Sequence, residues 1–472
     1  MHDRLPQHAA RPQIVVVVPS TGALRDFASG MITELEKTCD VKILGAAKVS
    51  PRNTDPPVTI SDYTPSRWRH ILYNTAKGLI HFAERRAWVV NAEYALYRAF
   101  AGVSPKQRRL VRWISRLGLA GVGGWIARQL LRATTPTLLP RHWSIDGILL
   151  VTSVESFFCD DIVRDAGQRR IPLLAYQGNW DNVTMKTFQE TPPYLAVWGE
   201  QSFLIARFIH RIPPHRLFVT GTPRFDMYGD LPSREAARAF LKLPLDRPII
   251  LFCGTSIPFD EASPLHAIGE AIRCGDLPTD LLVLYRPHPE RLPRANEPEF
   301  MSVPGCVEHA VIEVDNLPRN RLFPALLSAC DALISPFSTM AIEGARAGKP
   351  VLCLAYNHAN HRNFDWERQA FEMHNYVFWH ADWCINCVDF DQLLDRTKDL
   401  LRLIGSEEIA NEARVSSGMV FRQGSRGAAS RIAEAMHSVL DGNDSDLSFR
   451  LASASQLRAE TTAQAIVRDK DG

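Results

Sequence analysis

The chain of 472 residues has almost no excess charge and no long apolar run, and both absences narrow what it can do. Its formal net charge is +2, so charge alone gives no reason to expect nucleic acid as a partner. The longest uncharged apolar stretch, residues 117–127, is about half of the roughly 20 residues that a membrane-spanning helix needs. We therefore expect a chain that does not cross a membrane.

Cysteine is scarce and scattered in this sequence. There are nine cysteines, and Cys384 and Cys387 stand as a Cys-x-x-Cys pair. Zinc sites usually add a second such pair or a His-x-x-x-His, and neither lies near this one. We therefore expect reduced thiols, no metal site and a cytoplasmic location.

Strand-length apolar runs alternate with helical periodicity in both halves, which is typical of α/β domains. Residues 14–18 form a continuous apolar run that ends in a turn, as a buried parallel strand does. The second half is more regular and predicts a doubly wound parallel sheet, whose ligands bind at the carboxyl ends of the strands. Its expected strands are residues 249–252, 281–285, 311–314, 332–335 and 351–354.

The length of the chain requires more than one hydrophobic core, so we divide it into two domains. Residues 13–225 form the first and residues 248–440 the second, joined by a polar, proline-bearing linker at 226–247. We expect residues 1–12 to be a flexible N-terminus. Residues 441–472 are rich in Ser, Asp, Ala and Thr, and we expect a disordered tail there.

Residues 66–141 interrupt the α/β pattern of the first domain with a basic segment. The segment holds fourteen Lys or Arg residues and two acids, Glu84 and Glu93. Apolar residues such as Leu110 and Trp113 recur at helical spacing between the cations, so we expect a basic helical insertion. Three interpretations stay open: an anionic membrane surface, a groove for an acidic polysaccharide, or a solvated helical face.

Two loops of the second domain follow strand ends and carry groups that suit a phosphate. Gly254-Thr255-Ser256 combines a glycine that admits close approach with two hydroxyls, although an ordinary turn has the same composition. Arg286-Pro287-His288-Pro289 holds a histidine between two prolines, beside a permanent cation. The alternative for the second loop is a histidine that merely packs, with Arg286 on the surface.

A third loop carries Ser335, Ser338 and Thr339 into a short helix that bears Glu343. Hydroxyls and backbone N–H groups at the start of a helix can bind a phosphate. Glu343 is placed to accept hydrogen bonds from sugar hydroxyls. Hydroxyl residues also start ordinary helices, but the three loops together predict a site for a nucleotide-diphosphate donor.

The motifs Arg286-Pro287-His288-Pro289, Ser335-Pro336-Phe337-Ser338-Thr339 and Gly348-Lys349-Pro350-Val351, in this order, resemble the donor half of GT-B fold enzymes. Within that group the chain is similar to bacterial capsule and teichoic-acid polymer transferases, of the polysialyltransferase, Kdo-transferase and glycerophosphotransferase types. It is also similar to the UDP-N-acetylglucosamine 2-epimerases. Residues 219–226 resemble the interdomain stretch of these families, and residues 178–184 resemble a loop of related surface-polysaccharide enzymes.

The resemblance implies two Rossmann-like domains facing a cleft, with the acceptor on the first and the nucleotide donor on the second. It implies that His288 contacts the diphosphate, that Ser338 and Thr339 contact phosphate, and that Glu343 contacts ribose hydroxyls. With Gly254, Thr255, Ser256, Arg286 and Ser335 these residues make up the expected donor site. The donor would be a substrate, and no cofactor or metal is expected.

A glycosyl transfer with inversion needs a base that deprotonates the acceptor hydroxyl. Asp181 is the first candidate, because residues 177–180 directly follow a strand end in the first domain. Asp26, Glu155 and Asp160 are reserves. The alternative for Asp181 is a turn-forming residue bonded to its own backbone.

The sequence therefore predicts a glycosyltransferase that moves a sugar from a nucleotide donor to a bacterial cell-surface polysaccharide or glycolipid. Such an enzyme would work in the cytoplasm, at the inner face of the cell membrane. The alternatives are a CDP-glycerol glycerophosphotransferase, a UDP-sugar 2-epimerase and a non-catalytic protein that binds the membrane surface.

Overall fold

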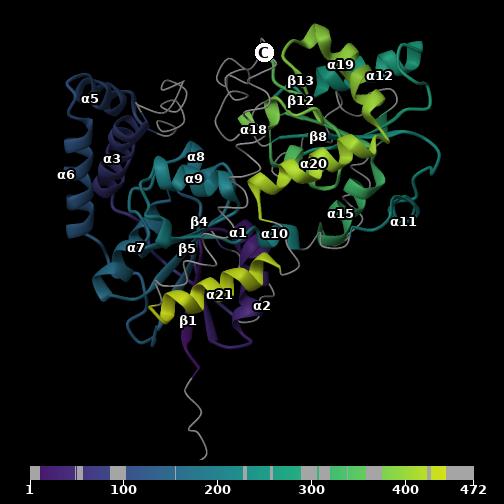
Figure 1. Ribbon diagram of the computed structural model, residues 1–472. Helices are drawn as coiled ribbons and strands as arrows, with labels where there is room; N and C mark the ends of the chain where they lie inside the picture. The colour runs from purple at the N-terminus through teal and green to yellow at the C-terminus, as the bar shows by residue number, and fades with distance from the viewer. Residues whose placement is uncertain are drawn as a thin grey trace, which may run out of the picture. The chain divides into compact units, whose positions relative to one another are not determined.

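The computed structural model describes most of the chain and separates it into two compact units (Figure 1). The first unit comprises Met1–Asp226 and Phe421–Gly472, and the second comprises Met227–Val420. The described residues are 11–47, 49, 57–85, 103–154, 156–226, 231–255, 259–288, 306–307, 319–336, 338–357, 375–422 and 427–442.

The first unit is built on a seven-stranded parallel sheet in the order β3-β2-β1-β4-β5-β6-β7. The chain runs outward from β1 in one direction and then returns to β4 and runs the other way, which is the doubly wound topology. The strands are β1 (Gln13–Val18), β2 (Asp40–Gly45), β3 (Val58–Ile60), β4 (Gly147–Thr152), β5 (Leu173–Gln177), β6 (Tyr194–Val197) and β7 (Leu217–Val219).

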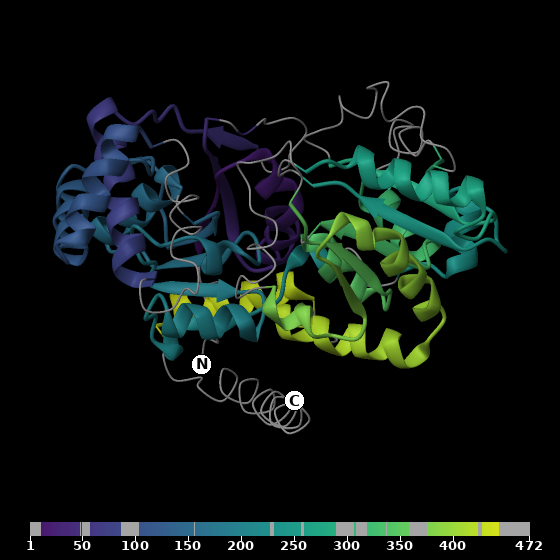
Figure 2. The ribbon, with the colours of Figure 1, turned by 90° about the horizontal axis from the view of Figure 1, so that it is seen from above.

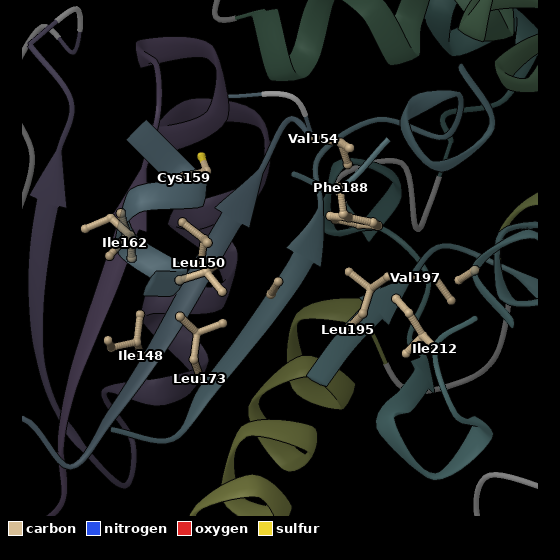
Figure 3. Packing of buried hydrophobic residues seen from close by; sticks show 14 of the residues in the cluster. Ile148, Leu150, Val154, Cys159, Ile162, Leu173, Phe188, Leu195, Val197 and Ile212 are labelled. Atoms are coloured by element: carbon tan, nitrogen blue, oxygen red, sulfur yellow. The ribbon is translucent and has the colours of Figure 1, made fainter. Parts of the chain in front are cut away.

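One face of this sheet packs against α7 (Phe157–Arg169) and α9 (Glu200–Phe208). Figure 3 shows Ile148 and Leu150 of β4 beside Ile162 of α7, with Leu195 of β6 farther along the same layer. All four side chains are fully buried, and burial of one such side chain contributes about 2 kcal/mol. The continuous apolar strands are thus explained by burial on both faces.

The opposite face is covered by α2 (Ser29–Leu35) and by α21 (Ala428–Leu440), which returns from the far end of the chain (Figure 1). The Asp226 carboxylate accepts hydrogen bonds from the Ala428 and Ala429 N–H groups, at 2.8 and 2.9 Å, and so caps α21. Our expectation that residues 421–440 belong to the second domain is therefore wrong. An apolar helical stripe does not say which of two sheets it will cover.

The insertion of the first unit consists of α3 (Arg67–Arg85), α5 (Pro105–Arg116) and α6 (Ala120–Ala133) among the described residues. Figure 2 shows these helices side by side in one layer. A buried ion pair joins the layer to α7, because the Arg69 guanidinium contacts both Asp161 carboxylate oxygens, at 2.7 and 2.8 Å. The Tyr73 hydroxyl donates to Asp160 beside it, at 2.5 Å.

The second unit has a six-stranded parallel sheet in the order β10-β9-β8-β11-β12-β13. Its order reverses between β8 and β11, as in the first unit between β1 and β4. The expected strand at residues 311–314 lies outside the described residues. The strands are β8 (Ile249–Cys253), β9 (Leu282–Arg286), β10 (Cys306–Val307), β11 (Ala332–Pro336), β12 (Val351–Leu354) and β13 (Cys384–Cys387).

Helices complete the two units around these sheets. Those of the second unit are α11 (Arg234–Phe240), α12 (Ala262–Cys274), α15 (Arg319–Ala329), α16 (Thr339–Arg346), α18 (Tyr376–Trp379), α19 (Leu393–Leu403) and α20 (Glu407–Val420). The first unit adds α1 (Thr21–Ala23), α8 (Asn182–Met185) and α10 (Pro223–Asp226). In the part of the chain that the structure describes, no helix is long and apolar enough to cross a membrane.

Candidate functional site

The carboxyl ends of β9, β8 and β11 are neighbours at one edge of the second sheet. Cys253 at the end of β8 pairs with Arg286 at the end of β9, and the Gly254 N–H donates to the Arg286 carbonyl at 2.8 Å. β11 lies on the other side of β8, where Ile334 pairs with Phe252. The three predicted loops therefore emerge at the point where the strand order reverses, which is where ligands bind in such sheets.

Gly254 is needed because other groups approach its backbone closely. A Cβ at this position would lie 2.5 Å from the Glu261 Oε2 and 3.0 Å from the His288 backbone nitrogen. Both distances are shorter than side-chain contacts normally allow. The loop after β8 and the loop that carries His288 are therefore packed against each other, and the third residue of the first motif, Ser256, lies outside the described residues.

Glu261 organises this edge and was not predicted from the sequence. It is 4% exposed and lies just before α12, where one carboxylate oxygen accepts from the Thr255 N–H at 3.0 Å. The other oxygen accepts from the Tyr285 hydroxyl at 2.6 Å. Because Tyr285 directly precedes Arg286, one buried carboxylate fixes both loops, and charge-assisted bonds of this kind are strong. An acid at a helix start beside a glycine loop is the signal that could have found it.

Arg286 and His288 stand at the end of β9. The Arg286 guanidinium lies over the Phe323 ring, 4.5 Å from its centroid, which orients the cation. Burial raises the pKa of the Cys253 thiol, and the nearby Arg286 charge opposes that rise. His288 is half-buried.

The third loop forms the start of α16. The Ser335 and Ser338 hydroxyl oxygens are 3.1 Å apart, and the Ser338 hydroxyl accepts from the Met340 N–H at 3.2 Å. Ser338 is thus the N-cap of α16 and Thr339 is its first residue. The positive end of the helix dipole lies at the same edge as Arg286, an arrangement that suits an anion.

Glu343 is 1% exposed on α16. Its carboxylate and that of Glu261 both add to the raised pKa of the Cys253 thiol, after burial itself. Glu343 lies on the helix that follows β11, and Glu261 lies just before the helix that follows β8. The described donor-site candidates of the second unit are therefore gathered around the ends of three adjacent strands.

Asp181 belongs to the first unit. It is half-buried at the start of α8, and its side chain makes no capping hydrogen bond there. The loop before it is fixed by the Gln177 side-chain amide, which donates to the Asn179 and Trp180 carbonyls at 2.8 Å each. The Trp180 ring is 4% exposed and packs in the interior. Asp181 is thus presented by a rigid turn at the carboxyl end of β5.

The reserve candidates have different surroundings. Asp160 is buried, bonded to Tyr73, and burial raises its pKa to about 7, whereas the Arg164 charge opposes that rise. Its placement makes it part of the joint between α3 and α7. The side chain of Asp26 and the whole of Glu155 lie outside the described residues.

No group of three or more His, Cys, Asp and Glu side chains among the described residues is arranged to hold a metal ion. Asp389 and Asp391 have the Asp-x-Asp spacing after β13. There the Asp389 carboxylate accepts from the Asp391 N–H at 3.1 Å and caps a short 3₁₀ helix, Phe390–Gln392.

Known proteins resemble this chain in structure, whereas comparisons of sequence find no match. No family model matches the sequence, and no curated protein matches it. Among solved structures, a protein from Listeria monocytogenes assigned as a UDP-N-acetylglucosamine 2-epimerase is 12% identical, with a TM-score of 0.50, and the match covers 92% of this chain and 98% of that one.

Two further solved structures match over a similar share of the chain. A glycosyltransferase from Rickettsia africae is 10% identical, covers 92% of this chain and 99% of its own, and has a TM-score of 0.47. The wall teichoic acid polymerase TagF is 11% identical, covers 92% and 90%, and has a TM-score of 0.48. At such identity a likeness shows the fold alone. The chain thus has the expected α/β fold of the GT-B type, with two Rossmann-like parallel sheets.

Proposed function

We propose that this chain is a glycosyltransferase that moves a sugar from a nucleotide-activated donor to a bacterial cell-surface polysaccharide or glycolipid. One observation carries the proposal. At the switch point of the second sheet, the half-buried Arg286 and His288, the N-terminus of α16 and the Glu261-bonded loop of Gly254 lie at adjacent strand ends.

The chemistry of a nucleotide-diphosphate leaving group matches these residues. Transfer leaves negative charge on the diphosphate, and a fixed guanidinium, an imidazole and a helix N-terminus stabilise charge without having to reorganise. Arg286 and His288 would hold the diphosphate, with the Ser338 hydroxyl and the Thr339 N–H on one phosphate. Glu343 would accept hydrogen bonds from the ribose hydroxyls. We propose that the transfer needs no metal, because these groups supply the charge.

The acceptor base would come from the first unit, and Asp181 is our candidate. It follows a fixed loop and its carboxylate caps no helix N–H group, which leaves its oxygens able to accept an acceptor hydroxyl proton. Asp181→Asn is expected to stop transfer and leave nucleotide binding unchanged. Equal turnover in this variant would remove Asp181 from the mechanism.

We further propose that the protein works in the cytoplasm at the inner face of the membrane, where lipid-linked acceptors would be met through the basic helical insertion. The competing functions use the same donor edge. A glycerophosphotransferase would release CMP from CDP-glycerol, an epimerase would isomerise a UDP-sugar without an acceptor, and a non-catalytic surface protein would bind no nucleotide.

A thermal-shift screen of the whole chain against UDP, CDP, CMP, GDP and ADP tests the donor assignment. One nucleoside diphosphate should raise the midpoint of unfolding, and Arg286→Ala should cancel that rise. Arg402→Ala, on the exposed side of α19, is the matched control and should keep it. No shift with any nucleotide, or an equal shift in Arg286→Ala, would overturn the proposed donor site.

A further inference from the structure

Large apolar side chains are exposed on the helical insertion to an unusual extent. The described residues expose seventeen large hydrophobic side chains, and ten of them lie between residues 68 and 130. Eight of the ten are on α5, α6 and the turn between them: Leu110, Trp113, Leu117, Leu119, Val122, Trp125, Ile126 and Leu130. Single exposed hydrophobics are common on soluble proteins, but a contiguous group marks an interaction surface.

The outward side of α5 centres on Trp113. Val111 and Ser115 are its buried residues, and Trp113 lies about 160° around the helix axis from each of them. The Trp113 side chain is 61% exposed. Arg109 and Arg116 flank it on the same side and are exposed as well. A tryptophan between arginines is thus presented outward.

In α6 the usual sorting of side chains is reversed. Its buried positions include Ala120, Gly124 and Ala127, and a Cβ on Gly124 would lie 2.9 Å from the Ile80 Cγ1 of α3. Val122 and Ile126 lie about 160° around the axis from Gly124. Apart from the buried Leu131, small residues of α6 face the protein and large apolar residues face outward, which costs free energy in water.

The positive charge on the outward side of α5 and α6 indicates which kind of partner it can bind. Residues 103–141 contain eight Lys or Arg residues and no Asp or Glu. Arg132 is engaged within the unit, since it forms an ion pair with Glu190. In α5, Lys106, Arg109, Arg112 and Arg116 are exposed around Trp113. Two copies of this surface related by a two-fold axis would bring like charges together, whereas an anionic lipid surface is complementary to it.

We infer that the outward side of α5 and α6, defined by Trp113, Leu117, Val122, Trp125 and Ile126, inserts into the interface of an anionic lipid bilayer. The inference rests on the proposed function in so far as it specifies the membrane partner of residues 66–141. Tryptophan is favoured at the boundary between headgroups and acyl chains, and nearby arginines bind anionic headgroups. Insertion would be shallow, because the other side of each helix is packed within the unit and neither helix is long enough to span.

The test is co-sedimentation of the full chain with lipid vesicles. The wild type should bind vesicles of phosphatidylcholine with phosphatidylglycerol and bind weakly to phosphatidylcholine alone. The triple variant Trp113→Ser, Val122→Ser and Trp125→Ser should partition about 100-fold less, at about fivefold per side chain removed. The matched control Leu204→Ser with Phe208→Ser changes exposed apolar residues of α9 and should bind as the wild type does.

A second variant separates charge from apolar insertion. Arg109→Gln, Arg112→Gln and Arg116→Gln should lose most of the preference for anionic vesicles, at about fivefold per arginine, while keeping the apolar side intact. Quenching of wild-type tryptophan fluorescence by brominated lipid should accompany binding. Equal vesicle binding of the wild type and the triple serine variant would overturn the inference.

Sedimentation of the protein without lipid tests whether a second copy of the chain covers this surface instead. A wild-type dimer that the triple serine variant converts to a monomer, with no vesicle binding by either, would also overturn the inference and assign the surface to a second copy. Nucleotide thermal shifts in the same variants report on the donor edge of the other unit. Failure of vesicle binding with intact nucleotide shifts therefore refutes this inference alone, and the reverse result refutes the proposed donor site alone.

Discussion

The two units share a topology and differ in what lies at their strand ends. Each has a central strand from which the order reverses, β1 in the first and β8 in the second. At the ends of β8 and β9 the second unit has glycine, arginine and histidine, and the buried Glu261 carboxylate bonds Thr255 and Tyr285 beside them. In the first unit, the helix that follows β4 uses Asp160 and Asp161 to hold the helical insertion. The same kind of sheet thus supports the proposed ligand edge in one unit and a structural joint in the other.

The largest expected effect concerns the donor edge. His288→Ala should lower kcat/KM for transfer by about 1,000-fold, because a donor that stabilises leaving-group charge is lost from a preformed site. Thermal unfolding without nucleotide should be unchanged. His215→Ala, in the first unit, is the matched control. Comparable kcat/KM values for the wild type and His288→Ala would show that His288 does not act in transfer. The proposed difference in function between the two sheet edges would then be lost.

The joint of the first unit should respond to pH. The folded pKa of Asp160 is raised by burial to about 7, from an ordinary value near 4, so the folded state binds a proton that the unfolded state has released. Its contribution to stability is present at low pH and is lost as the pH rises from about 4 to about 7. The loss is on the order of 4 kcal/mol, at about 1.4 kcal/mol for each pKa unit.

Asp160→Asn removes this titration and keeps a hydrogen-bond acceptor for Tyr73. Denaturant unfolding across pH 4 to 7 should show the wild type losing stability relative to the variant, with no further relative change at higher pH. Asp276→Asn, an exposed position of the second unit, should follow the wild type. A constant difference in the free energy of unfolding between wild type and Asp160→Asn over this range would contradict the raised pKa of Asp160 in the folded state.

Gly254→Ala tests the close packing of the donor edge. The new methyl group would meet the Glu261 carboxylate and the His288 backbone, so we expect a loss of about 2 kcal/mol of stability in the second unit and weaker nucleotide binding. Gly275→Ala is unsuitable as a control because its φ is +85°. Gly167→Ala on α7, with no atom near its Cβ, should be neutral or stabilising. The result that counts against close packing is a Gly254→Ala protein as stable as the wild type.

The smallest effect is expected for Glu261, which positions groups and is not proposed to touch the donor. Glu261→Gln should raise KM for the donor about tenfold and change kcat less, because a charged acceptor becomes a neutral one while the shape is kept. Tyr285→Phe should produce part of this effect. A fall in kcat at unchanged KM would instead place Glu261 in the reaction itself.

Much of the second sheet could be predicted from the sequence. The apolar runs at 249–252, 332–335 and 351–354 became β8, β11 and β12 within a residue at each end, because a strand buried on both faces must be apolar throughout. β13 was missed, since Cys384-Ile385-Asn386-Cys387 is short and partly polar. The strand expected at 311–314 stays a prediction.

From the sequence we predicted three of the loops at this edge, and we missed Glu261. Gly254, Arg286, His288 and Ser338 stand in motifs whose composition is local, so the sequence alone indicates a phosphate-binding edge. Glu261 acts on two loops from outside both motifs, and only the fold brings it there. The roles assigned to these residues, and to Asp181, stay predictions for the experiments above.

By itself the sequence determined the class of fold, the number of sheets and the basic character of the insertion, because periodicity and charge are properties of neighbouring residues. Tertiary structure alone decided that α21 covers the first sheet, that a buried carboxylate joins the loops of the proposed donor site, and that α6 turns Val122, Trp125 and Ile126 outward. These outcomes depend on which surfaces meet. The sequence around an apolar helical stripe or a single acid does not specify the distant segment that it will contact. That contact is determined by the packing of segments that are far apart in the chain.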